Sequence, residues 1–342
     1  SAETGGKNAI ILTASGDRDH AIMNIVASAF GNAGQKCSAC SLLLVERSVY
    51  EDKNFQDKLK DAATSMKVGS VWNPGNVVGP MITNKNDKLL KALELEKGES
   101  WLVPPRFLDK HKYVLAPTVK WGVRPGNYSF RTELFGPMLS VVCIENLQQG
   151  INWVNSLDYG LTSGLQSLDE GEQKLWKDSI MAGNLYINRG ITGAIVNRQP
   201  FGGMKLSAFG GGVKAGGPNY CACFVKITDK LGSTTDYTQS YVKAYEQEFA
   251  HARDVNNLYG EQNAFRYLPL KNMVLRLFPG DNNEDAKMIA LAARICHTPL
   301  SISFEPGDDR TAALASLGCP LKEEALAGFL KSMKNYERIR TC

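Results

Sequence analysis

Short apolar runs alternate with amphipathic helical patterns along residues 1 to about 205, and this alternation constrains the fold more than any other feature of the sequence. Four apolar runs predict strands, and three patterns between them predict helices. Because strands that alternate with helices build parallel sheets, the expected class is α/β with a mostly parallel sheet. The strands are expected at Ala9–Thr13, Ser41–Val45, Met138–Ile144 and Asn184–Ile187, and the helices at His20–Phe30, Asn54–Ser65 and Glu170–Ile180.

A second, smaller α/β unit is expected beyond this region. The Gly-rich stretch Gly202–Gly217 interrupts the pattern and leads into a predicted extended segment, Tyr220–Ile227, and then into the polar residues Leu231–Gly260, which suggest a linker and a helix. After it, a strand, a helix, a strand and a final helix are expected at Met273–Phe278, Asn283–Cys296, Leu300–Phe304 and Ala325–Cys342.

Composition excludes several classes of protein. The chain has 342 residues and a net charge of +4, a surplus too small and too scattered to indicate a nucleic-acid partner. Its longest apolar runs are far shorter than the roughly 18 residues of a membrane span. Eight cysteines in a chain of this length do not form a disulfide framework, which favours a reducing, cytoplasmic compartment. The first residues carry no signal-peptide pattern and both ends look cut, so a fragment of a longer protein is expected.

The segment Gly34–Cys40 is the sharpest local feature of the sequence. Cys37 and Cys40 fit a Cys-x-x-Cys redox pair, half of a metal site, a buried structural cysteine or a nucleophile with an incidental neighbour. The scattered histidines and the other cysteines offer no second pair of metal ligands, so no metal is expected. Cys221 and Cys223 are predicted to share one face of an apolar strand, where ordinary packing is the simpler interpretation.

Motifs on both sides of Cys37 carry a resemblance to a known family. Glu3-Thr-Gly-Gly-Lys-Asn precedes it, and Glu133-Leu-Phe-Gly-Pro and Arg198-Gln-Pro-Phe-Gly-Gly follow it. In these motifs, their order and their separations, the chain resembles the aldehyde dehydrogenase superfamily. The stretch Ala182–Arg189, followed by Thr192–Val196 and Arg198–Gly203, is similar to the L-glutamate γ-semialdehyde (Δ1-pyrroline-5-carboxylate) dehydrogenases, including the bifunctional bacterial proline utilization A proteins. The resemblance covers residues 1 to about 230.

The resemblance implies a covalent mechanism for aldehyde oxidation. An aldehyde C–H is a poor hydride donor until its carbon is tetrahedral and carries an oxyanion, and a thiolate brings this about. The resemblance assigns Cys37 as this nucleophile, with its backbone N–H as one oxyanion donor. It assigns Glu3 as the base that activates water to hydrolyse the thioester. An ordinary strand-end carboxylate is the alternative for Glu3. In the fully assembled enzyme Cys37 is expected to be the most reactive thiol, because a cysteine near a cationic or amide-rich site is partly ionised.

NAD is the cofactor that the resemblance implies. Glu133 is the counterpart of the carboxylate that holds the nicotinamide ribose, and Phe135 would flank the nicotinamide ring. Thr4 and Gly5, with Gly6, would lie against the cofactor, where a Cβ would obstruct a close approach. The alternative for Glu133–Pro137 is a simple turn before a strand. FAD is expected only if a proline dehydrogenase domain lies upstream on the same polypeptide.

Four residues are expected to recognise the substrate. A semialdehyde with an α-carboxylate needs hydrogen-bond donors for its charge, and amides in a Gly-containing turn supply them. By resemblance Gly193 and Ala194 donate their amides, Ser38 adds its hydroxyl, and Phe201 packs on the aliphatic chain. A plain surface loop is the alternative for the segment around Gly193.

The expected protein is thus the catalytic domain, residues 1–205, of an NAD-dependent L-glutamate γ-semialdehyde dehydrogenase of proline catabolism. Residues 206–232 are expected to hold a Gly-rich loop and an oligomerisation strand, and residues 233–342 an incomplete, non-catalytic, Rossmann-like C-terminal domain. Because the NAD-binding domain of this family precedes Glu3, the chain by itself is expected to be nearly inactive. A homo-oligomer is expected for the full-length protein. The alternatives are an aldehyde dehydrogenase for another semialdehyde and a non-catalytic interaction fragment.

Overall fold

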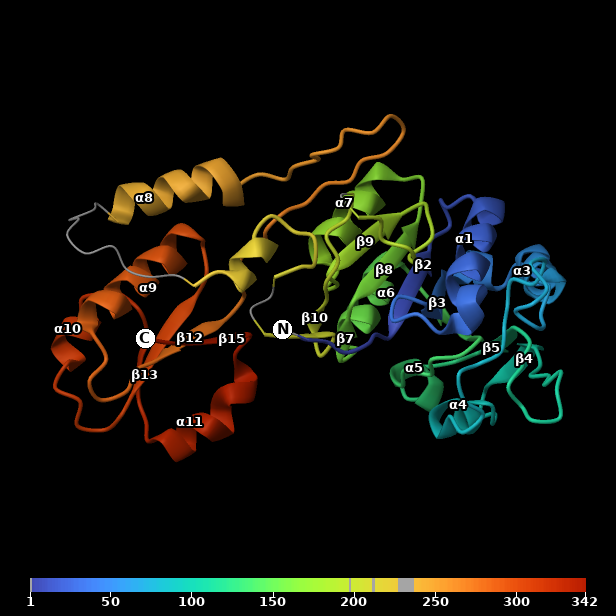
Figure 1. Cartoon of the computed structure of the whole chain (residues 1–342), viewed down its shortest axis with the longest axis horizontal. Helices are drawn as coiled ribbons and strands as arrows, with labels where there is room; N and C mark the ends of the chain where they lie inside the picture. The colour runs from blue at the N-terminus through green and yellow to red at the C-terminus, as the bar shows by residue number, and fades with distance from the viewer. Residues whose placement is uncertain (1, 197, 211–212, 227–236) are drawn as a thin grey trace. The chain divides into compact units, whose positions relative to one another are not determined.

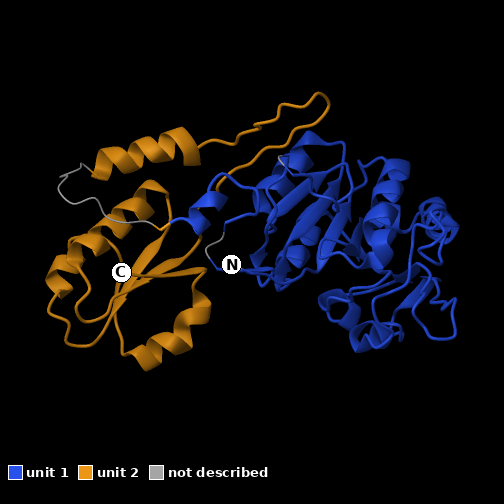
Figure 2. Cartoon of the chain, viewed as in Figure 1, with its two compact units in different colours: residues 1–225 blue, residues 226–342 orange. Residues whose placement is uncertain are grey.

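A seven-stranded sheet forms the centre of residues 1–225, the first of two units in the chain (Figure 2). The computed structural model describes residues 2–196, 198–210, 213–226 and 237–342. All neighbouring strands of the sheet are parallel except the first pair, so the predicted α/β class is confirmed. In sheet order the strands are β4 (Ser100–Val103), β5 (Thr118–Trp121), β6 (Met138–Ile144), β3 (Cys40–Glu46), β2 (Asn8–Leu12), β8 (Thr162–Gln166) and β9 (Asn184–Ile187).

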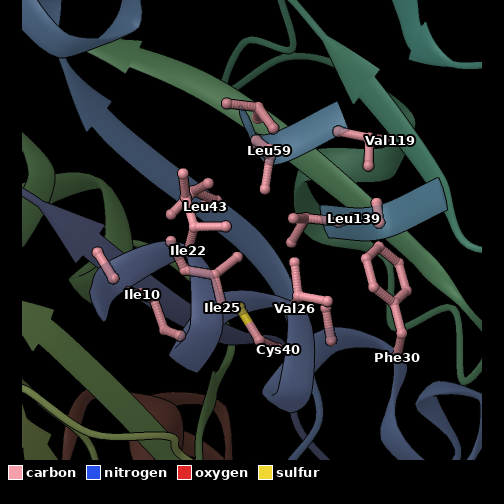
Figure 3. Close-up of a cluster of buried hydrophobic side chains, with 14 of the residues drawn as sticks. Ile10, Ile22, Ile25, Val26, Phe30, Cys40, Leu43, Leu59, Val119 and Leu139 are labelled. Carbon is pink, nitrogen blue, oxygen red and sulfur yellow. The ribbon is translucent and has the colours of Figure 1, made fainter. Parts of the chain in front are cut away.

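Helices cover both faces of this sheet (Figure 1). Successive side chains of a strand point to opposite faces, so Ile10 packs with the helices of one face and Ile11 with those of the other. The first cluster includes α1 and α3 (Figure 3), and the second includes α6 and α7. The helices are α1 (Arg18–Phe30), α2 (Arg47–Tyr50), α3 (Lys53–Ser65), α4 (Asp87–Ala92), α5 (Tyr128–Arg131), α6 (Leu147–Asn155) and α7 (Glu170–Ser179).

The strands and helices expected in residues 1–205 are confirmed within two residues at each end. Two small antiparallel ribbons complete the unit, and a short helical turn, η1 (Gly31–Gly34), follows α1. The ribbons pair β1 (Ala2–Glu3) with β11 (Ala208–Phe209) and β7 (Tyr159–Gly160) with β10 (Met204–Lys205).

The predicted extended segment Tyr220–Ile227 is wrong over its first five residues, which form the 3-10 helix η2 (Tyr220–Phe224). Cys221 and Cys223 are exposed, so the predicted packing on one face of a strand is wrong as well. A strand needs a neighbour to accept its main-chain hydrogen bonds, and no described strand of the chain pairs with this segment. Ile227 lies outside the described residues, as does the predicted boundary between residues 232 and 233.

The second unit, residues 226–342, contains a four-stranded parallel sheet. Its order is β14 (Leu321–Glu323), β13 (Leu300–Phe304), β12 (Met273–Arg276) and β15 (Arg338–Thr341). Its helices are α8 (Tyr237–Ala244), which continues as a π-helical turn, η3 (Tyr245–Phe249), then α9 (Asn283–Ile295), α10 (Thr311–Ala315) and α11 (Leu326–Ser332), with the 3-10 turn η4 (Met333–Asn335) after α11. This confirms the expected strand–helix–strand unit.

The predicted helix Ala325–Cys342 is wrong beyond Asn335, where the chain forms β15 instead. The strand adds to the free edge of β12 in parallel register, from Met273 opposite Arg338 to Arg276 opposite Thr341. Tertiary pairing therefore overrides the local helical pattern at this end of the chain.

The carboxyl end of β12, where a Rossmann fold binds phosphate, is occupied by the protein's own side chains. The Arg310 guanidinium donates to the carbonyl oxygens of Phe278 at 3.0 Å and Asp281 at 2.7 Å. The Asp281 carboxylate in turn accepts from the Phe278 amide at 2.7 Å. The non-catalytic role expected for this unit stays a prediction.

Candidate active site

The amino ends of β2 and β3 bring the two predicted catalytic residues together. The strands are parallel neighbours with Asn8 opposite Cys40, so the segments that precede them lie at the same edge of the sheet. Glu3 lies before β2, and Cys37 lies before β3. The carboxylate of Glu3 is near enough for its charge to act on the Cys37 thiol. The sheet thus places a nucleophile beside a carboxylate at one edge.

Cys37 is exposed, whereas Cys40 is buried. Three consecutive residues with positive φ, namely Asn32 at 56°, Ala33 at 53° and Gly34 at 65°, reverse the chain between α1 and Cys37. Cys40 enters the core with β3, and its sulfur lies among the apolar side chains of α1 (Figure 3). Burial raises the pKa of Cys40 to about 12. Cys40 is therefore an inert core residue, and Cys37 is the candidate nucleophile.

Although Cys37 is exposed, partial desolvation raises the pKa of its thiol, and the negative charge of Glu3 raises it further. The main-chain amides of Ser38 and Cys37 oppose this shift but do not overcome it. Reaction at neutral pH therefore requires a group that takes the thiol proton. That Cys37 is partly ionised in the fully assembled enzyme stays a prediction.

Asn8 holds the Cys37 segment in place and was missed by the sequence analysis. Its side-chain amide donates to the carbonyl oxygens of Cys37 at 2.6 Å and Ala39 at 3.0 Å, and its Oδ1 accepts from the Thr162 amide at 3.1 Å. Asn8 is buried, so each of these bonds is shielded from water. It is the last residue of the motif that begins at Glu3, which is the one sequence signal that could have indicated it.

One corner of this edge of the sheet is formed by Gly5, Gly6, Glu133 and Phe135. The Gly6 amide donates to Glu133 Oε1 at 2.9 Å. Gly5 has a φ of 148°, and a Cβ there would lie 2.7 Å from Glu133 Oε2, so only glycine fits. Phe135 has a φ of 50°, a strained conformation for a residue with a side chain. A carboxylate held by a main-chain amide in a glycine cradle fits the ribose of a dinucleotide.

Lys7 adds a buried cation to this corner. Its side chain is 3% exposed, and its amine has no hydrogen-bond partner in the described part of the chain. Burial lowers the pKa of Lys7 to about 7, while the neighbouring groups Cys40 and Glu133 oppose the shift. Sequence analysis assigned Lys7 no role.

Ser38 and Phe201 lie at the same edge of the sheet as Cys37. Ser38 is buried, and its carbonyl oxygen accepts from Thr162 Oγ1 at 3.3 Å. Its hydroxyl makes no hydrogen bond with the described residues, and this leaves it available to a ligand. Phe201 forms two main-chain hydrogen bonds with Ala215, at 3.0 and 2.9 Å. The Asn184 side chain, at the amino end of β9, forms hydrogen bonds with the residues on either side of Phe201.

Gly193 and Ala194 follow a segment that runs along α1. The ring of His20, in the first turn of α1, hydrogen-bonds to the Asn188 carbonyl oxygen at 2.9 Å. Further along, the Ile191 amide donates to Ser28 Oγ at 3.0 Å. The segment therefore advances toward the end of α1 from which the Cys37 turn begins. Gly193 has a φ of 81°, which favours glycine, but no described hydrogen bond joins Gly193 or Ala194 to Cys37 or Ser38.

Thr4 is tied to the Gly-rich loop. Its hydroxyl donates to the Leu206 carbonyl oxygen, and its amide donates to the Ser207 carbonyl oxygen at 3.2 Å. Its side chain thus makes a structural bond that fixes the strand carrying Glu3. The proposed cofactor contact of Thr4 stays a prediction.

Across residues 2–196, 198–210, 213–226 and 237–342, no group of three or more His, Cys, Asp or Glu side chains could hold a metal ion. Within the same ranges, no helix is long and apolar enough to cross a membrane.

Cys37 is expected to react with iodoacetamide at least about tenfold faster than Cys40, because an exposed thiol reacts and a buried one does not. Limiting reagent followed by peptide mapping measures both rates in one sample. Faster labelling of Cys40 would remove Cys37 as the candidate nucleophile, as would faster labelling of Cys223 in the complete protein.

The site combines an exposed cysteine, Cys37, with the nearby carboxylate of Glu3 and the glycine-lined carboxylate of Glu133, on a mostly parallel α/β sheet. These features define a class of protein, the enzymes that oxidise aldehydes through a thiol. The sequence model of the aldehyde dehydrogenase family matches residues 1–229. The chain therefore belongs to the aldehyde dehydrogenase family.

Several similar curated proteins are named 1-pyrroline-5-carboxylate dehydrogenase. Those of Geobacillus sp. (strain WCH70) and Bacillus subtilis (strain 168) are each 35% identical over 221 residues, which are 64% of this chain and 42% of each relative. The chain thus spans less than half the length of the curated relatives that it matches.

Two solved structures extend the comparison. Proline utilization A (PutA) from Corynebacterium freiburgense matches with a TM-score of 0.80 and 37% identity over 98% of this chain and 38% of that protein. The 1-pyrroline-5-carboxylate dehydrogenase from Thermus with bound NAD matches with a TM-score of 0.60 and 36% identity over 66% of this chain and 43% of that protein.

Proposed function

We propose that this chain carries the catalytic centre for NAD-dependent oxidation of L-glutamate γ-semialdehyde to L-glutamate. The observation that supports it most is the exposed Cys37 thiol within the electrostatic reach of Glu3, at an edge where Asn8 fixes the segment around Cys37. The relatives named 1-pyrroline-5-carboxylate dehydrogenase support the substrate. The NAD-bound Thermus enzyme supports the cofactor.

Cys37 performs the first step. Its proton passes to a base, and the sulfur adds to the aldehyde carbon to form a thiohemiacetal. The main-chain amide of Cys37 donates to the oxygen that becomes negative in this step. Asn8 keeps that amide in position, because it fixes the carbonyl oxygens of Cys37 and Ala39. The residue that completes the oxyanion site is not assigned in this chain.

The corner of Gly5, Gly6 and Glu133 fits the cofactor, since a Cβ at Gly5 would fill the space beside the Glu133 carboxylate. Glu133 would accept the ribose hydroxyl protons, and the uncrowded Gly5 would permit close approach of the nicotinamide. NAD, when bound, supplies the hydride acceptor. The Gly6 amide keeps Glu133 oriented throughout, since it donates to Oε1 at 2.9 Å.

Glu3 performs the last step. The oxidised carbon is held on Cys37 as a thioester, and Glu3 takes a proton from the water that attacks it. The C–S bond breaks, the acid leaves, and Cys37 is restored. β1 presents the Glu3 carboxylate to this site because its pairing with β11 and the Thr4 hydrogen bonds fix the strand.

Ser38→Ala is expected to lower catalytic efficiency toward glutamate semialdehyde roughly tenfold to a hundredfold, since a hydrogen bond to a charged group contributes roughly 1.5 to 3 kcal/mol. Ser38 is buried beside Cys37 and its hydroxyl has no partner among the described residues, so the hydroxyl is free to donate to the substrate carboxylate. The measurement is kcat/KM in the complete protein, with an uncharged aldehyde of similar length as the control. Equal losses for both aldehydes would favour an enzyme for another semialdehyde.

A further inference from the structure

The Lys214 side chain lies against the loop that carries Phe201. Its ammonium donates to the Gly183 carbonyl oxygen and, at 3.4 Å, to Asn184 Oδ1. The neighbouring Ala215 exchanges two main-chain hydrogen bonds with Phe201. The side chain is therefore anchored at both ends, by main-chain pairing at its base and by two oxygen acceptors at its tip.

Gly202 separates Lys214 from the predicted base. A Cβ placed on Gly202 would lie 3.1 Å from Lys214 Cγ and 3.5 Å from Glu3 Oε1, so a single methyl group would touch both side chains. The described residues form no direct ion pair between Lys214 and Glu3. The charge of Lys214 thus acts on the Glu3 carboxylate across the main chain of Gly202, which has no side chain.

The electrostatics of the two residues are linked. Burial lowers the pKa of Lys214 to about 8, and the charge of Glu3, the one titratable group that acts on it appreciably among the described residues, opposes the shift. Glu3 in turn raises the pKa of Cys37, whereas Lys214 has no comparable effect on Cys37. The larger influence of Lys214 on the thiol is therefore the one through Glu3.

We propose that Lys214 is a positioning residue for Glu3, which it attracts toward Gly202 and whose negative charge it partly balances beside Cys37. The proposal rests on the proposed function only in taking Glu3 as the base. It assigns a role to a lysine outside the Cys37 and Glu133 motifs. A carboxylate held in this way faces the thioester in one orientation and repels the thiolate less.

The effect of Lys214 on Glu3 should depend on pH. Because the pKa of Lys214 is about 8, its ammonium is present below pH 8 and is lost as the pH rises through 8. Above that pH Glu3 loses its partner. An arginine at this position stays charged over the whole range, so it should remove the transition.

The first test needs neither substrate nor NAD. In Lys214→Met, the alkylation rate of Cys37 at pH 7.5 should fall about threefold or more, equivalent to a rise of about half a pKa unit in the thiol. The same change in a Glu3→Gln background should have almost no effect, and Lys214→Arg should restore the rate. The matched control is Lys205→Met, because Lys205 also donates to two main-chain carbonyl oxygens, at 2.8 and 2.9 Å.

Equal losses with and without Glu3, or no loss in Lys214→Met, would overturn the proposal. If Lys214→Met does not fold, the alkylation rate of Cys37 is compared between Lys214→Arg and the unchanged protein across pH 7 to 10. The proposal requires a change in this rate near pH 8, from loss of the Lys214 proton, in the unchanged protein alone. These outcomes do not depend on dehydrogenase activity, so failure of the proposed function would appear separately, as absence of aldehyde oxidation.

In the active complete protein, the second readout is thioester hydrolysis. Lys214→Met should slow steady-state turnover about tenfold and leave the amplitude of the initial burst of NADH intact, while the burst rate falls only by the smaller factor seen in alkylation, since hydrolysis depends most on the displaced base. Loss of the burst together with turnover would indicate a general structural role and contradict the proposal.

Discussion

Replacing Cys37 by alanine is expected to lower the rate of aldehyde oxidation in the complete protein by about four orders of magnitude or more, as for other covalent nucleophiles. The reason is chemical, since without a sulfur on the carbonyl carbon no tetrahedral centre forms and the C–H remains a poor hydride donor. NADH formation from glutamate semialdehyde measures the loss. The variant should keep its thermal stability, because Cys37 is exposed and supports no core contact.

Cys40→Ala is the matched control, three residues away on the same segment. Cys40 is 1% exposed and packs against α1, so its loss should cost about 1 kcal/mol of stability and leave kcat within about threefold. Residual activity in Cys37→Ala comparable to that of Cys40→Ala would mean that the reaction does not pass through a thioester on Cys37.

The central sheet is predictable from the sequence because its signals are local. Ala9–Thr13 and Ser41–Val45 are continuous apolar runs, as expected for strands buried on both faces, and β2 and β3 occupy these positions within one residue. Their helices carry one apolar stripe each, and α1 and α3 begin within two residues of the predicted starts. Local pattern and tertiary environment agree here, so neither overrides the other.

The last strand of the second unit was not predictable in this way. Residues beyond Asn335 look helical by themselves, yet the free edge of β12 offers main-chain hydrogen bonds that a local pattern does not reveal. The segment Tyr220–Phe224 shows the converse. Its alternation suggests a strand, but without a described neighbouring strand it forms a helical turn with exposed cysteines.

The residues of the candidate site also differ in whether local sequence signals predict them. Cys37 and Glu3 belong to motifs, so their chemistry could be inferred from residue types and order. Asn8 and Lys214 act through carbonyl and amide oxygens that the fold brings to them, from Cys37 and Ala39 in one case and from Gly183 and Asn184 in the other. Such partners leave no periodicity or spacing in the sequence, although Asn8 itself ends the motif that begins at Glu3.

Glu3→Gln is expected to slow steady-state turnover about a hundredfold to ten-thousandfold while the first burst of NADH remains, because general base catalysis of thioester hydrolysis is lost. The glutamine is of the same size but takes no proton from water. Rapid-mixing measurement of NADH separates the burst from the later steady state. Glu46→Gln, a change of the same kind at the far end of β3, is the control and should leave both phases intact.

The same variant should also alkylate faster at Cys37, since removal of the Glu3 charge lowers the pKa of the thiol. Glu3 therefore opposes formation of the thiolate while it favours release of the acid, and Glu3→Gln should change the two steps in opposite directions. A structural role for Glu3 would slow both. Loss of the burst with faster alkylation would instead show that Glu3 takes the Cys37 proton during attack on the aldehyde, and that hydrolysis uses another base.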